Sequence, residues 1–139
     1  MRIAAAAATV VLAALVAFAV QRPPPSFGAP PIAIVRGAAG QVLWSIRLAP
    51  AAHEIAADRL AAPSRGGHAD QLWLRTPAGP RSLGLLPRHG RAVIPEIPAF
   101  VQTLTGSGEL LVSREPPGGS RLSRPSGPVM FWAVFGPSG

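Results

Sequence analysis

The chain has 139 residues, no cysteine, and a formal net charge of +7 that is carried entirely by arginine, because lysine is absent. The absence of cysteine excludes disulfides and thiolate metal sites, and the absence of lysine excludes Schiff-base catalysis. The arginines are scattered singly along the chain, which is typical of a solvated surface and argues against a nucleic-acid partner.

An apolar segment without any charge covers residues 3–20, directly after Met1 and Arg2. As a helix it would be about 27 Å long, close to the ~30 Å hydrocarbon core of a bilayer. We therefore expect a transmembrane helix within residues 1–20, a single pass through the plasma membrane, and an extracytoplasmic remainder. A cleaved signal peptide is the alternative, because Ala17-Phe18-Ala19 has the small-x-small form of an exit site. The protein would then be secreted or periplasmic.

Short strands are predicted for most of the remaining chain. Residues 21–31 are rich in proline and predict a stiff, extended linker. Beyond them, apolar residues alternate with polar or small ones between turn residues, which predicts strands over 32–36, 41–48, 53–57, 71–76, 81–86, 91–97, 109–115 and 129–135. Residues 98–104 are ambiguous and are compatible with a helical turn. About eight short strands predict an all-β fold, an antiparallel β-sandwich over residues 32–136.

The tryptophans receive different predictions. Trp44 lies on the apolar face of its strand and is expected in the core. Trp73 shares a strand face with Gln71 and Arg75, so we expect it to be partly exposed, either lining a sheet edge or acting as a contact residue. Residues 129–135 are apolar on both faces, which predicts a central or covered strand.

Residues that could carry chemistry do not form a recognised pattern. His53-Glu54 begins like a zinc-protease motif, but position 57 is alanine where the second histidine would stand. The histidines and the carboxylates are dispersed singly, so neither a metal site nor a pair of catalytic carboxylates is indicated. We therefore expect no cofactor, no metal and no enzymatic activity.

Two stretches carry a more specific pattern. The first is residues 71–74 (Gln-Leu-Trp-Leu), followed by the turn at 77–80 and by residues 82–84 (Ser-Leu-Gly). The second is residues 111–120 and then 125–129, with a Val-Ser-x-Glu-Pro-x-Gly-Gly-Ser segment followed by Pro-Ser-Gly-Pro-Val. Their order and spacing resemble the extracytoplasmic C-terminal domain of bacterial anti-sigma-K factors, the RskA family. The residues that carry the resemblance are Gln71, Trp73, Gly79, Gly84, Ser113, Glu115, Pro116, Gly118, Gly119, Gly127 and Pro128.

The turn after residue 115 can also be interpreted without the family. Gly118 or Gly119 can supply the positive φ that such a turn needs. Glu115 stands just before the turn and has two equal interpretations. Either it accepts backbone N–H hydrogen bonds and fixes the turn, or it is simply exposed.

The resemblance implies a non-catalytic membrane regulator of transcription. In that family a cytoplasmic domain sequesters an extracytoplasmic-function sigma factor, and the outer domain senses or stabilises and is a target of regulated proteolysis. Only Met1 and Arg2 precede the apolar segment here, so we do not expect this chain to bind a sigma factor directly. Three explanations stay open: a free-standing outer domain, a start inside a longer reading frame, or an inner half on a separate polypeptide.

The implied partners follow from this hypothesis. They are the membrane, a regulatory protease, and a sigma factor reached indirectly or through a cytoplasmic anti-sigma partner chain. The alternative hypothesis is an exported β-sandwich that binds a protein or a carbohydrate, because a fold by itself does not fix a function.

Overall fold

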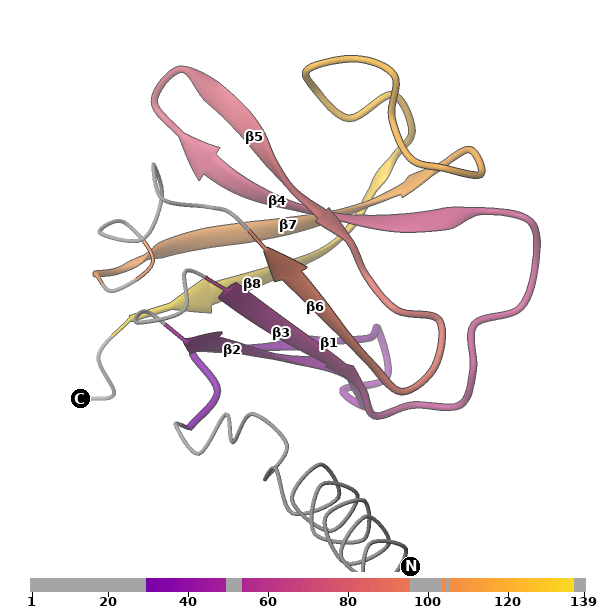
Figure 1. Ribbon diagram of the computed structural model, residues 1–139, viewed down its shortest axis with the longest axis horizontal. Helices are drawn as coiled ribbons and strands as arrows, with labels where there is room; N and C mark the ends of the chain where they lie inside the picture. The colour runs from indigo at the N-terminus through magenta and orange to yellow at the C-terminus, as the bar shows by residue number, and fades with distance from the viewer. Residues whose placement is uncertain (1–29, 50–53, 96–103, 105, 137–139) are drawn as a thin grey trace, which may run out of the picture.

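The computed structural model describes residues 30–49, 54–95, 104 and 106–136, which form two four-stranded antiparallel sheets (Figure 1). Sheet A has the order β1-β2-β3-β6, with β1 (Ala33–Arg36), β2 (Val42–Ala49), β3 (Glu54–Arg59) and β6 (Arg91–Pro95). Sheet B has the order β5-β4-β7-β8, with β4 (Ala69–Thr76), β5 (Gly79–Leu85), β7 (Gly108–Glu115) and β8 (Val129–Phe135). The predicted all-β fold is confirmed.

The two sheets bury one apolar core between their facing sides. Alternate residues of each strand point inward, as the period of a strand requires. The largest of them are fully buried: Trp44, Phe135, Ile46, Ile55, Leu72, Leu74, Leu110, Val35 and Val112. Burying one such side chain stabilises the fold by about 1.5–3 kcal/mol. Strand β1 lies beside β8, and β5 comes near β6, so the edges of the two sheets approach each other.

The strand ranges expected from the sequence agree with the observed ones to within about two residues at each end. The clearest difference is β3, which continues to Arg59 because Asp58 and Arg59 pair with Ser45 and Trp44 of β2. Leu104 is buried, and the rest of the ambiguous stretch 98–104 lies outside the described residues.

Trp44 is in the core, as predicted, whereas the expectation for Trp73 is wrong. Trp73 has an exposed fraction of 0%. Strand β4 lies between β5 and β7, so that Ser82 and Leu111 flank Trp73 directly in the register. Neighbours on both sides cover an outward-facing ring on a central strand. Trp73 therefore has no free surface to offer a partner.

The prediction for residues 129–135 is also wrong. They form β8, which is the edge strand of sheet B and not a central one. Its outward-facing side chains remain exposed, with exposed fractions of 54% for Trp132 and 79% for Val134. An apolar pattern on both faces predicts burial, but the chain supplies no ninth strand in its described part to cover this one.

Among the described residues, no helix has the length and the apolar character needed to cross a bilayer. The predicted helix within residues 1–20 and most of the predicted linker at 21–31 lie outside the described residues.

Candidate functional site

Several of the residues predicted to matter lie together on the outer face of sheet B, around the buried carboxylate of Glu115. One carboxylate oxygen of Glu115 accepts a hydrogen bond from the Ser113 hydroxyl at 2.5 Å and another from the Ser126 backbone N–H at 3.1 Å. The other oxygen accepts from the Gly127 N–H at 3.1 Å and from the Ser126 hydroxyl. We call these four residues, Ser113, Glu115, Ser126 and Gly127, the Glu115 clasp. Of the two interpretations of Glu115, the structure shows the hydrogen-bonded one.

The hydrogen bonds of the clasp decide the ionisation of Glu115. Burial by itself raises the pKa of this carboxyl. The hydrogen bonds from the Ser113 and Ser126 side chains and from the Gly127 and Ser126 N–H groups all favour the charged form, and together they lower the pKa below its usual value. The clasp therefore holds an ionised carboxylate.

Gln71 of β4 binds the connection between β7 and β8 at a second point. Its side-chain oxygen accepts a hydrogen bond from the Ser120 N–H at 2.7 Å, and its amide nitrogen donates to the Ser82 hydroxyl at 2.7 Å. Gly119 has a φ of +94°, and a Cβ there would lie 2.8 Å from the Gln71 side-chain oxygen. Only glycine fits this close approach without a shift.

Trp73 joins this network through its indole. Its N–H donates to the Ser113 hydroxyl at 2.8 Å, and that hydroxyl in turn donates to Glu115. A Cβ on Gly127 would come within 1.8 Å of the Arg114 carbonyl oxygen, so the returning chain lies directly against β7. The residues of this outer face thus pin the connection between β7 and β8 to the sheet, and every carboxylate oxygen among them has a donor.

The remaining predicted residues serve turns nearby. Gly118 has a φ of +88°, and the Gly119 N–H donates to the Pro116 carbonyl at 2.9 Å, which closes the turn after β7. The Pro128 carbonyl accepts from the Arg114 N–H at 2.9 Å, just before β8 begins. Gly79 and Gly84 also have positive φ values and lie in β5, apart from the Glu115 clasp.

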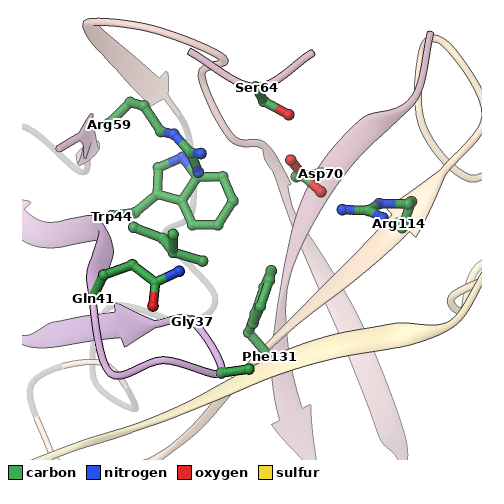
Figure 2. Close-up of a pocket in the computed structure, with 10 residues that line it drawn as sticks. Gly37, Gln41, Trp44, Arg59, Ser64, Asp70, Arg114 and Phe131 are labelled. Carbon is green, nitrogen blue, oxygen red and sulfur yellow. The ribbon is translucent and has the colours of Figure 1, made fainter. Parts of the chain in front are cut away.

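A second feature, which the sequence analysis missed, is a pocket of about 290 Å³ at one end of the core (Figure 2). The two sheets both contribute to it. Trp44 and Phe131 form its aromatic part, with ring centroids 6.1 Å apart and planes inclined at 58°. The guanidinium of Arg59 lies over the Trp44 ring at 4.3 Å, a cation–π contact. The indole N–H of Trp44 is also fixed, because it donates to the Pro87 carbonyl at 3.0 Å.

Asp70 is the unusual residue of this pocket. Its exposed fraction is 5%, and its Oδ1 atom is buried without a hydrogen-bond partner among the described residues. Its Oδ2 atom lies 3.8 Å from Nε2 of His68, which is beyond hydrogen-bonding distance. Arg114 stands directly opposite Asp70 in the β4–β7 register, and Figure 2 shows its guanidinium turned towards the carboxylate.

Ser64, His68 and Asp70 superficially resemble a catalytic triad, but their geometry does not fit one. The Ser64 hydroxyl lies 3.3 Å from Nε2 of His68. The same nitrogen is the one that faces Asp70. A triad needs the carboxylate on one ring nitrogen and the hydroxyl on the other, because the histidine must pass a proton while the aspartate holds it in place. This arrangement offers no activated nucleophile.

A metal site does not form around these residues either. His68 and Asp70 are two potential ligands, and within the described ranges no group of three histidine or carboxylate side chains comes together. Two ligands from the protein are fewer than a structural or catalytic zinc site uses.

The comparison with known families covers nearly the whole chain. The family model for the C-terminal part of the anti-sigma-K factor rskA matches residues 3–129. The chain belongs to this family. The resemblance found in the sequence is thereby confirmed, and the matched residues include the Glu115 clasp and nearly all of the pocket. No curated protein and no solved structure matches the chain.

A signal for the pocket was present in the sequence. Leu72 and Leu74 define the inner face of β4, and counting back by two along the strand places Asp70 on that same face. A carboxylate on the apolar face of a strand predicts a buried charge. The same count along β7, from Leu110 and Val112, places Arg114 on the inner face of that strand. No comparable signal pointed to Ser64, which lies outside the strands.

Proposed function

We propose that this protein is a non-catalytic regulatory domain of the anti-sigma-K type, held at the plasma membrane by residues 1–20 with its β-sandwich outside the cytoplasm. The observation that carries the proposal is the family match over residues 3–129. That match begins inside the apolar segment, which supports treating the segment and the sandwich as parts of one unit.

The role that we assign is indirect control of an extracytoplasmic-function sigma factor. The outer domain senses or stabilises, and the effect reaches the sigma factor through a cytoplasmic partner or through regulated proteolysis. The lack of triad geometry at Ser64, His68 and Asp70 supports a regulatory function over a hydrolytic one.

The proposal is tested by a transcription assay in the source bacterium. Deletion of the gene is expected to change transcription from promoters that depend on one extracytoplasmic-function sigma factor, and the full chain supplied in trans is expected to restore it. A version whose residues 1–20 are replaced by a cleavable signal peptide serves as the control for anchoring. Unchanged transcription across all such promoters would contradict the regulatory role.

The location has its own test. In spheroplasts, added protease is expected to digest the sandwich, and the full chain is expected to fractionate with membranes. Protection of the sandwich until the cells are lysed would contradict the extracytoplasmic placement. Recovery of the full chain only in the soluble exported fraction would contradict the anchor.

A further inference from the structure

We propose that the Asp70 pocket binds a small zwitterion, a ligand that presents an ammonium group to Asp70 and a carboxylate to Arg114. Free α-amino acids and very short peptides have this chemistry. Binding itself is argued from the pocket alone, whereas the idea that this ligand is the signal rests on the proposed function.

The need for a cationic group comes from Asp70. Its Oδ1 atom is buried and has no donor within the described part of the chain, and the exposed fraction of Asp70 is 5%, so water does not solvate the carboxylate freely. A buried acceptor without a partner costs about 1–3 kcal/mol, and more when it is charged. The neighbouring His68 ring is 3.8 Å from the other oxygen and does not satisfy Oδ1. An ammonium group would supply a charge-assisted hydrogen bond, which is stronger than a neutral one.

The need for an anionic group comes from the arginines. Arg59 and Arg114 both line the pocket, so arginine outnumbers aspartate there by two to one. A ligand that is only a cation would meet repulsion from both guanidinium groups. Arg114 stands opposite Asp70 in the register and is exposed, and its planar guanidinium suits a carboxylate through two parallel hydrogen bonds.

The remaining walls favour a ligand with an apolar body. Trp44, Phe131 and Leu43 supply ring and methyl surfaces around the charged groups. A volume of about 290 Å³ lies near the lower end of the ~300–1,000 Å³ that is common for small-molecule sites. Both the size and the lining therefore fit a single amino acid such as leucine.

Titration calorimetry on the full chain in detergent micelles tests the proposal. The probes are L-leucine, 3-methylbutylamine, which lacks the carboxylate, and 4-methylpentanoate, which lacks the amine. We expect saturable binding of leucine and at least about tenfold weaker binding of each of the other two, because one charge would remain unpaired in either case. Equal binding of the amine would overturn the zwitterion assignment. If leucine does not bind, the other L-amino acids and the dipeptide Ala-Ala are tested, and no binding across this panel would overturn the site.

Three variants locate the binding. Asp70→Asn and Arg114→Met are each expected to weaken the binding of the amino acid at least about tenfold. Arg121→Met, which removes an exposed arginine of the β7–β8 connection, is expected to bind as the unchanged protein does. Unweakened binding by Asp70→Asn would overturn the site.

A measurement without ligand separates a binding role from a structural one. Because Oδ1 of Asp70 has no hydrogen-bond partner among the described residues, the thermal stability of Asp70→Asn is expected to equal or exceed that of the unchanged protein. A clear loss of stability would assign Asp70 a structural role instead. The sigma-dependent reporter distinguishes the two proposals. If the amino acid binds but deletion of the gene leaves the reporter unchanged, the pocket stands and the regulatory role is overturned. If deletion of the gene changes the reporter but no amino acid binds, only the pocket is overturned.

Discussion

Asp70 and Glu115 are two buried carboxylates one register step apart on neighbouring strands of sheet B. Glu115 pairs with Ala69, and Asp70 pairs with Arg114, so their side chains point to opposite faces of the sheet. Their exposed fractions are similarly small, 2% for Glu115 and 5% for Asp70. The difference lies in their hydrogen bonds. Both oxygens of Glu115 have donors, whereas Oδ1 of Asp70 has none among the described residues.

This comparison shows that burial alone does not reveal what a charged residue does. A buried carboxylate whose oxygens are all satisfied stabilises the connection that supplies its donors. A buried carboxylate oxygen without a hydrogen-bond partner costs stability, so its presence needs an explanation, and the bound ligand that we propose supplies one. We therefore assign the Glu115 clasp to the stability of the fold and the Asp70 pocket to the proposed ligand binding. Four predictions test this contrast.

The largest effect is expected from Glu115→Ala. The variant leaves the Ser113 hydroxyl and the N–H groups of Ser126 and Gly127 without their acceptor, so we expect a loss of about 3 kcal/mol in the free energy of unfolding. Chemical unfolding followed by tryptophan fluorescence measures it. The control is Glu109→Ala on the same strand, which removes a half-buried carboxylate paired with the exposed Arg75 and should cost below about 1 kcal/mol. Equal losses in both variants would contradict the clasp.

Gly127→Ala is expected to have the next largest effect. Its Cβ would lie 1.8 Å from the Arg114 carbonyl oxygen, so the backbone must move, at a cost of about 2 kcal/mol. Gly67→Ala is the matched control, because no atom lies within 4 Å of the added methyl group there. The same chemical unfolding compares the two, and a loss in Gly67→Ala as large as that in Gly127→Ala would argue against the tight contact.

The pH dependence of stability should depend on Glu115. Its folded-state pKa is lowered, so between the folded value and the unfolded value of about 4.3 the unfolded chain binds more protons than the folded one. The stability from this group is present above pH ~4.3 and is lost as the pH falls through the folded pKa. Thermal unfolding between pH 3 and pH 7 should show a shallower acid slope in Glu115→Gln than in the unchanged protein. An identical slope would contradict the lowered pKa.

The smallest change in stability is expected for Asp70→Asn. Replacing a buried carboxylate whose Oδ1 atom lacks a hydrogen bond by a neutral amide removes a desolvation cost, so we expect the free energy of unfolding to stay equal or rise by up to about 1 kcal/mol. Chemical unfolding of this variant beside Glu115→Ala gives the contrast directly. A loss comparable to that of Glu115→Ala would mean that the two carboxylates play the same role.

The alternation of apolar residues was enough to predict most of the fold. It located all eight strands, and it placed Trp44 in the core, because one face of β2 is continuously apolar. It did not predict strand order, so it misjudged Trp73, which lies on a central strand, and β8, which lies at an edge. Strand order depends on contacts between distant segments, and local periodicity contains no information about them.

The two candidate sites also differ in how far the sequence could predict them. Three of the four residues of the Glu115 clasp, Ser113, Glu115 and Gly127, were singled out by the family resemblance, and the turn chemistry around them is local in sequence. Ser126 was not named as a site residue, although it lies in the same motif. The pocket brings together residues from β2, β3, β4, β7 and β8, and its defining feature is a hydrogen bond that is missing. A missing partner becomes visible only when all neighbours have been placed.

The most direct test of the contrast is thermal unfolding of the full chain and of Asp70→Asn, each with and without L-leucine. A ligand that binds only the folded state raises the Tm. We expect leucine to raise the Tm of the unchanged protein and to leave that of Asp70→Asn unmoved, with the variant no less stable when leucine is absent. An equal rise in both proteins, or a variant that is clearly less stable without ligand, would contradict the assignment of Asp70 to binding and of Glu115 to structure.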